Sequence, residues 1–225
     1  MALTDNLVSY YKMEGNSNDS VGSNNGTDTS ITYSAGNGKI GQGAGFNGSS
    51  SYIIAPFLNL SQGSVSFWVN FTSLSTSPDI IVSNQNTDGS DTYTQLNVGS
   101  NGSMNWYSAV NELDHVTSAG VITTGVWYNI IFTYDGTTIK CYVNDVEKSL
   151  TNSTSGIYWL TTGNQTVIGA LKRGSQLYSA TNGKIDEGGI WSRALSAAEI
   201  TELYNGGAGL TYPFVSNQAN FLAFF

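Results

Sequence analysis

Trp127-Tyr128-Asn129-Ile130-Ile131-Phe132-Thr133-Tyr134-Asp135-Gly136-Thr137-Thr138-Ile139-Lys140-Cys141-Tyr142-Val143 is the stretch that decides the fold class. Its first half, 127–134, is dense in aromatic and β-branched residues, which is typical of a strand. Its second half, 138–143, alternates apolar and polar residues with the period of a half-buried strand. Two such runs around Asp-Gly predict a β-hairpin. Asn144-Asp145 then predicts a second turn into a further strand.

Strand signals continue on both sides of this hairpin. Large apolar residues stand at alternate positions in 65–71, which again predicts a half-buried strand. Further strands are predicted at 7–13, 43–46, 52–55, 79–83, 93–98, 104–107, 167–171 and 183–190. Clusters of Gly, Asn and Ser separate many of these runs. Short strands at this spacing predict an all-β sandwich or barrel.

One helix is predicted, at 196–204. Ser196 with Glu199 three residues later forms a capping box, and Gly206-Gly207 provides a C-terminal stop. A single short helix cannot build the repeated βαβ units of an α/β fold, so that class is excluded. The predicted organisation is one sandwich domain over 1–210, followed by an apolar tail or extra strand over 211–225.

Composition excludes several classes of partner. The chain has 225 residues with a formal net charge of -8, so phosphate backbones should repel it and nucleic acid is not an expected partner. No apolar run approaches the roughly 20 residues of a membrane-spanning helix. Cys141 is the only cysteine, and its place in an alternating strand predicts a buried thiol.

The two ends of the chain suggest where the protein works. Residues 1–5 lack the basic and apolar regions of a signal peptide. The last residues, Phe221-Leu222-Ala223-Phe224-Phe225, are apolar, and burying each large side chain would contribute about 1.5–3 kcal/mol. We therefore expect the tail Phe221–Phe225 to attach to another protein subunit or to close the domain's own sheet. Together these features lead us to expect display on a virus particle, such as a bacteriophage, or on another extracellular assembly.

Five segments, in order, resemble the laminin-G-like domains of the concanavalin A-like lectin/glucanase superfamily. They are 7–22, 38–52, 64–70, 127–145 and 183–200, the last containing Gly183-Lys184-Ile185-Asp186-Glu187. The resemblance implies an antiparallel two-sheet jelly-roll sandwich of the pentraxin and laminin-G type, with one short C-terminal helix and one concave sheet. This fold hosts lectins, adhesion domains, glycosidases and structural modules, so the activity has to be argued from the site.

Catalysis is not expected. Retaining glycosidases need two carboxylates about 5 Å apart, and related glucanases carry them as Glu-x-Asp-x-x-Glu on one strand, a run that is absent here. Asp186 and Glu187 are strand neighbours and should point to opposite faces. His115 has no catalytic context and is expected in a loop or on the surface. We therefore predict no catalytic residues and no enzyme, which leaves a glycoside hydrolase relative as the least favoured alternative.

A calcium ion is predicted from the resemblance. Calcium takes six to eight oxygen ligands, and the loop at 16–25 is rich in Asp and Asn. Similar domains hold calcium between such a loop and the acidic residue of the Ile-Asp-Glu motif, which implies Asp19, Asn25 and Asp186 as ligands, with Glu14 in reserve. The alternative is a set of ordinary polar turns with side-chain hydrogen bonds and no ion.

A glycan is the predicted ligand, because sugars stack on aromatic rings and bond to planar polar side chains. Trp68, Trp127 and Trp191 lie within strand motifs and are expected in the core. Aromatic residues near loop ends, with possible cationic and aromatic neighbours, form the predicted platform: Tyr93, Trp106, Tyr107, Trp159, Arg173 and Tyr178. The sequence thus favours a non-catalytic carbohydrate-binding or adhesion module over a purely structural virion decoration or fibre protein without glycan binding.

Overall fold

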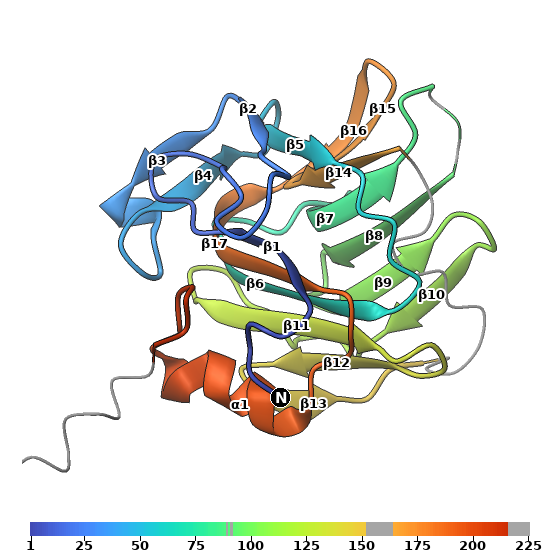
Figure 1. Ribbon diagram of the computed structural model, residues 1–225. Helices are drawn as coiled ribbons and strands as arrows, with labels where there is room; N and C mark the ends of the chain where they lie inside the picture. Colours follow the sequence, from blue (N-terminus) through green and yellow to red (C-terminus); the bar gives the residue numbers. More distant parts are fainter. Residues whose placement is uncertain (89, 91, 152–163, 216–225) are drawn as a thin grey trace, which may run out of the picture.

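The computed structural model describes residues 1–88, 90, 92–151 and 164–215. Two large antiparallel sheets pack face to face (Figure 1). Sheet A contains β1 (Leu7–Tyr11), β3 (Thr32–Ser34), β4 (Gly43–Asn47), β6 (Gly63–Phe71), β11 (Tyr128–Tyr134), β12 (Ile139–Val143), β13 (Val146–Lys148) and β17 (Asn182–Trp191). Sheet B contains β2 (Thr27–Thr29), β5 (Tyr52–Pro56), β7 (Asp79–Gln85), β8 (Tyr93–Val98), β9 (Met104–Ser108), β10 (Leu113–Val116) and β14 (Gln165–Ile168).

The remaining elements are few. β15 (Ala170–Arg173) and β16 (Gln176–Ala180) form a separate hairpin. The helical elements are α1 (Ala197–Tyr204) and two short 3-10 turns, η1 (Ala35–Asn37) between β3 and β4 and η2 (Asn205–Gly207) after α1. Sheet A has the order β13-β12-β11-β6-β17-β4-β3, with β1 also paired to β17, and sheet B has the order β10-β9-β8-β7-β14-β5-β2. These observations confirm the predicted all-β sandwich with one short C-terminal helix.

The central hairpin has the predicted strands but a longer connection. Tyr134 pairs with Ile139, so the loop spans 135–138. The Asp135 carboxylate accepts hydrogen bonds from the backbone N–H groups of Thr137 and Thr138, both at 2.8 Å. The turn predicted at Asn144-Asp145 is present, because both residues have left-handed backbone angles and Val143 pairs with Val146.

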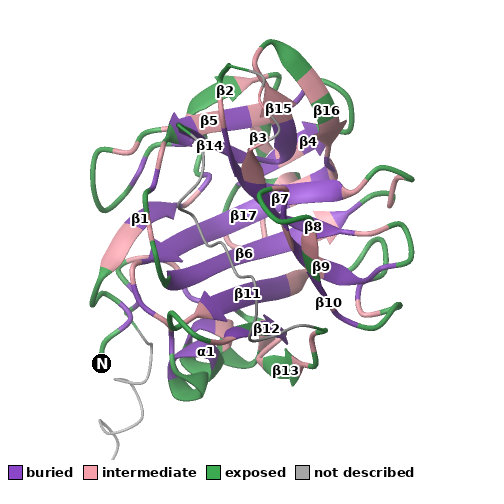
Figure 2. Ribbon diagram, turned by 90° about the vertical axis from the view of Figure 1, so that its right-hand side faces the viewer, coloured by how far each residue is buried: buried purple, intermediate pink, exposed green. Residues whose placement is uncertain are grey.

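The core between the sheets consists of the inward side chains of both, among them Phe67, Phe132 and Ile53, all fully buried. Figure 2 shows the buried central strands β6, β11 and β17. Cys141 belongs to this core, as predicted, and burial raises the pKa of its thiol. His115 corrects our expectation of a surface residue. It lies in β10 opposite Trp106 and is fully buried, because strand alternation turns both side chains inward.

A second apolar cluster covers the outer side of sheet A. It joins Tyr10 and Trp191 of the sheet to Leu203 of α1 and to Leu210 and Phe214 beyond it. The packed domain therefore extends to Phe214, past the boundary predicted at 210. Residues Phe221–Phe225 lie outside the described part of the chain. Within the described residues, we find no helix of sufficient length and hydropathy to span a membrane.

The other tryptophans predicted in the core differ in their packing. Trp68 is buried, but it stacks on Tyr204 of α1, on the outer side of sheet A, with ring centres 5.8 Å apart. Trp191 is fully buried, whereas Trp127 is only half-buried. The helix begins with the predicted capping box of Ser196 and Glu199.

The strand predicted at 167–171 is broken in two, and the break shapes the outer face of sheet B. Gly169 has φ +82° between β14 and β15, a conformation that favours glycine. Beyond it, β15 lies against β7: the Ser83 hydroxyl donates to the Ala170 carbonyl at 2.9 Å, and Lys172 N–H donates to the Gln85 side chain at 2.8 Å. The β15–β16 hairpin therefore projects beside this face, as Figure 1 shows.

Candidate functional site

The outer face of sheet B follows from strand alternation in β8 and β9. Leu96, Val98, Met104 and Trp106 belong to the core, so the residues between them point outward. Cross-strand pairing extends the face, since Gln85 of β7 stands opposite Tyr93 and Asp114 of β10 opposite Tyr107. The outer face of sheet B is thus formed by Gln85, Tyr93, Gln95, Asn97, Asn105, Tyr107 and Asp114.

Four of the six predicted ligand-binding residues meet on this face. The ring centres of Tyr93 and Tyr107 are 5.8 Å apart. The guanidinium carbon of Arg173 lies 5.4 Å from the ring centre of Tyr93 and 3.7 Å from that of Tyr178, within the range of cation–π contacts. The four side chains come from β8, β9, β15 and β16, so the hairpin and the sheet form one cluster.

The two sheet tyrosines keep their protons at neutral pH. Burial raises the pKa of Tyr93, and the neighbouring Tyr107 adds to the effect. Burial also raises the pKa of Tyr107, with a further contribution from the negative charges of Asp114 and Glu112. The two hydroxyls also hydrogen-bond to each other, so the pair stays protonated and one of its protons is used within the pair.

Trp106 is not part of the cluster. It is fully buried, and its ring centre lies 6.1 Å from that of Phe132 in the core. Its position near a loop end suggested exposure, but alternation places it on the side of β9 opposite to Tyr107. The prediction of Trp106 as a platform residue is therefore wrong. Trp159 lies outside the described residues.

Four side-chain amides on the same face were missed by sequence reasoning. Gln85 Nε2, Gln95 Oε1, Asn97 Nδ2 and Asn105 Oδ1 are shielded from solvent and have no hydrogen-bond partner among the residues that the structure describes. Leaving a buried polar atom unpaired costs about 1–3 kcal/mol, which points to a partner that the described residues do not supply. Alternation with the core residues of 93–98 and 104–108 was the signal that could have placed three of these amides beside the tyrosines.

The predicted calcium ligands accept hydrogen bonds from backbone N–H groups in two separate sets. The Asp19 carboxylate accepts hydrogen bonds from the backbone N–H groups of Tyr10, Val21 and Asn24 at 3.0–3.1 Å, and Asn25 accepts from the N–H of Asp19. The Asp186 carboxylate accepts from a different set: Lys39, Ile40 and Glu187 at 2.7–3.0 Å. Glu14 accepts from Gln42 N–H. In the part of the chain that the structure describes, no three acidic, His or Cys side chains gather around a metal position.

Asp186 and Glu187 lie on the same side of sheet A, contrary to our expectation. A bulge follows Asp186, and Glu187 has φ +48°. Glu187 therefore reaches the Tyr10 hydroxyl, which donates to it at 2.6 Å. Burial raises the pKa of both carboxyls, to about 7 for Asp186 and about 8 for Glu187. Both are buried beneath the outer cluster, so the pair does not offer an exposed acid and base.

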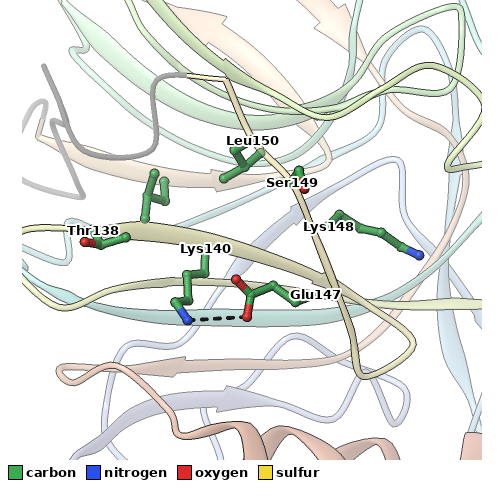
Figure 3. A pocket seen from close by; sticks show the side chains of 7 residues that line it. Thr138, Lys140, Glu147, Lys148, Ser149 and Leu150 are labelled. Atoms are coloured by element: carbon green, nitrogen blue, oxygen red, sulfur yellow. Dashed lines mark hydrogen bonds and ion pairs between the residues drawn. The ribbon is translucent and has the colours of Figure 1, made fainter.

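A shallow pocket of about 270 Å³ opens at the edge of sheet A that β13 forms, between β12 and β13 (Figure 3). Its polar lining includes an ion pair between Lys140 and Glu147 at 3.3 Å. None of the predicted site residues lines it. An exposed pair of this kind contributes little binding energy, so we assign the candidate site to sheet B.

Comparison with solved structures shows the same fold in carbohydrate-active proteins. Domain 4 of AbnA, an extracellular arabinanase from Geobacillus stearothermophilus, superposes with a TM-score of 0.70 at 24% identity, covering 87% of this chain and 97% of that one. The Trypanosoma rangeli sialidase gives 0.71 at 15% identity, but this chain spans only 34% of it. The Ruminococcus gnavus sialidase CBM40 domain gives 0.55 at 14% identity, with 64% and 82% coverage. At these identities the likeness establishes the fold alone.

The sequence comparisons define the family. No curated protein matches the chain significantly. The family described as the concanavalin A-like lectin/glucanases superfamily (Laminin_G_3) matches residues 46–201. This match spans most of the sandwich, from β4 into α1, and agrees with the two-sheet fold. The chain belongs to the concanavalin A-like lectin/glucanase superfamily.

Proposed function

We propose that this protein is a non-catalytic carbohydrate-binding or adhesion module that holds its ligand on the outer face of sheet B, beside the β15–β16 hairpin. One observation carries the proposal: the rings of Tyr93 and Tyr107 adjoin four amides, each with one shielded atom that has no partner within the described part of the chain. Sugar rings offer apolar C–H faces to aromatic side chains and hydroxyls to planar amides. This face supplies both kinds of contact.

Two of the structural neighbours support this choice. The arabinanase domain is described in complex with arabinotriose, and the CBM40 domain is described bound to α2,3-sialyllactose. Both are domains of carbohydrate-active proteins, and both have the sandwich fold found here. They make oligosaccharides the first ligands to test on this chain.

The non-catalytic part of the proposal is supported by how the carboxylates are used. Asp114, on the candidate face, accepts a hydrogen bond from the Asn105 amide. Asp186 and Glu187 are buried at sheet A. An exposed pair of carboxylates about 5 Å apart would be the requirement for retaining hydrolysis. Incubation with any glycan that binds, followed by product analysis, tests this part, and released sugar would refute it.

A glycan array followed by isothermal titration calorimetry tests the binding. Tyr93→Ala and Tyr107→Ala should each weaken binding about tenfold, which corresponds to ~1.4 kcal/mol. Tyr33→Ala is the matched control, because Tyr33 is a partly buried tyrosine in β3 of sheet A. Absence of glycan binding, or equal affinities in all three variants, would overturn the proposal.

The second part of the proposal concerns location. Display on a virus particle or another extracellular assembly is supported by the apolar sequence Phe221–Phe225, which follows the exposed Val215. Native mass spectrometry of the full chain and of a variant lacking residues 215–225 tests attachment to a neighbouring subunit. Assembly that is lost with the tail while the fold persists supports it. Assembly without any glycan binding would favour the purely structural virion protein.

A further inference from the structure

Gln85 offers a hydrogen-bond donor to the outer face of sheet B. Its Oε1 accepts from Lys172 N–H at 2.8 Å. A backbone N–H only donates, so this contact fixes which end of the amide is oxygen. The other end, Nε2, is shielded, and no described residue bonds to it. Gln85 therefore has an N–H group that needs an acceptor.

Asn105 offers the opposite group. Its Nδ2 donates to the carboxylate of Asp114, and an ionised carboxylate only accepts. The orientation of this amide is thus fixed as well. Its Oδ1 is shielded and accepts from none of the described residues, so Asn105 has a carbonyl that needs a donor. Between these two residues, Asn97 Nδ2 and Gln95 Oε1 repeat the same combination of donor and acceptor.

A ligand that satisfies this face must both accept and donate. Carboxylate and sulfate groups only accept, and ammonium groups only donate, whereas a hydroxyl does both. We infer that the outer face of sheet B selects uncharged, hydroxyl-bearing oligosaccharides, with Gln85 and Asn105 as the residues that determine this specificity. The inference rests on the proposed function and adds the class of glycan.

The spacing of the two amides requires an oligosaccharide. Gln85 stands opposite Tyr93, and Asn105 stands opposite Asn97. These positions on β8 are four residues apart, which is about 13 Å along a strand. A single sugar ring does not span that distance. Tyr93 lies at the Gln85 end, and Tyr107, opposite Gln95, lies between the two ends, so aromatic rings provide stacking surfaces along the way.

Charge on this face also disfavours acidic sugars. Asp114 and Glu112 stand close enough to Tyr107 to raise its pKa, and the whole chain carries a net charge of -8. Like charges brought together at an interface weaken binding. Arg173 is the cation at the other end of the cluster, and one face of its guanidinium stacks on Tyr178. Arg173 is a cation to which an acidic ligand could bind on this face, and its substitution tests that alternative.

The experiment compares a neutral and an acidic oligosaccharide on the full-length chain. Arabinotriose and lactose are the neutral probes, and α2,3-sialyllactose is the acidic one. Gln85→Glu replaces the unpaired donor by an acceptor of the same shape, while Gln62→Glu adds the same charge at an exposed position just before β6 of sheet A, away from the candidate face. Asn105→Leu removes the unpaired acceptor and serves as a second variant if Gln85→Glu does not fold. Circular dichroism monitors folding throughout.

We expect binding of a neutral probe that salt barely affects, with affinity about tenfold or more weaker in Gln85→Glu and in Asn105→Leu, as is usual for a lost hydrogen bond in a buried contact. Gln62→Glu should remain within about twofold of the wild type. Neutral binding that survives both substitutions overturns the inference. Binding of the acidic probe alone, lost at high salt and in Arg173→Ala, overturns the ligand class but leaves carbohydrate binding intact. If neither class binds and the array is empty, the proposed function itself has failed.

Discussion

The guanidinium of Arg193 donates two parallel hydrogen bonds to the carboxylate of Glu199, at 2.6 and 2.9 Å. Arg193 also donates to the backbone carbonyls of Ala2 and Asp5, both at 2.9 Å. Glu199 in turn accepts from the backbone N–H of Ser196 at the start of α1. One buried ion pair therefore joins the N-terminal segment, the end of β17 and the helix.

This pair predicts acid sensitivity. Burial alone would raise the pKa of Glu199, but the hydrogen bonds from Arg193 and Ser196 and the charge of Arg193 lower it to about 2. The folded state then binds fewer protons than the unfolded state, so the stabilisation is present above the unfolded pKa and is lost as pH falls towards 2. Urea unfolding between pH 7 and pH 2 should show Glu199→Gln less stable at pH 7, with the deficit shrinking in acid. A deficit that stays constant with pH would contradict this account.

Substitution of Trp106 and Tyr107, which are adjacent in β9, should affect different properties: folding stability for Trp106 and glycan binding for Tyr107. Trp106→Ala empties a site in the core and should lower the free energy of unfolding by about 3–5 kcal/mol. Tyr107→Ala removes a partly exposed ring and should cost less than about 1 kcal/mol while weakening glycan binding. Chemical denaturation and calorimetric titration of the two variants make the comparison. Similar losses of stability in both would mean that the assigned faces of β9 are wrong.

Asp19 and Asp186 should stabilise the fold through hydrogen bonds and without an ion. Asp19→Ala and Asp186→Ala each leave three backbone N–H groups without their acceptor, a loss of about 1–3 kcal/mol for each buried group left unpaired. A chelator should leave the melting temperature of the wild type unchanged. Calcium at about 100 times its dissociation constant would instead add roughly 2.7 kcal/mol, so a chelator-induced decrease that added calcium reverses would support the calcium hypothesis.

The turn between β12 and β13 can be improved. Asn144 and Asp145 both have positive φ, at 51° and 60°, a conformation that costs most residues about 1–2 kcal/mol. Asn-Gly is the preferred pair for such a turn, so Asp145→Gly should raise the free energy of unfolding by about 0.5–1 kcal/mol. The control is Asp135→Gly in the preceding turn, which should destabilise the protein because Asp135 accepts two backbone N–H bonds there. The prediction fails if both substitutions have the same sign in thermal unfolding.

Much of the sandwich could be predicted because its central strands bury alternate residues, so apolar residues recur at every second position in the sequence. β8 was predicted with the bounds Tyr93–Val98 that the structure has. The three-residue strands β2 and β3 were missed, because they are largely exposed and their pairing depends on distant neighbours. The bulge after Asp186 reversed the predicted side of Glu187, and local alternation carries no signal for such an irregularity.

The candidate site was predictable only in its conspicuous residues. Tyr93, Tyr107, Arg173 and Tyr178 stood out as aromatic or cationic side chains near turns. Gln85 and Asn105 did not, because amides are abundant in this chain and their significance lies in an atom left unpaired by the fold. That property depends on Lys172 and Asp114, which come from other strands.

The β15–β16 hairpin pairs with neither main sheet, yet it brings Arg173 and Tyr178 to the candidate face. Its tip at Gly174-Ser175 can therefore vary in length or sequence without altering the ladders of the sandwich. Related proteins could therefore differ in this hairpin while keeping the same sandwich. A designed library could likewise vary the hairpin alone to change which sugar is bound.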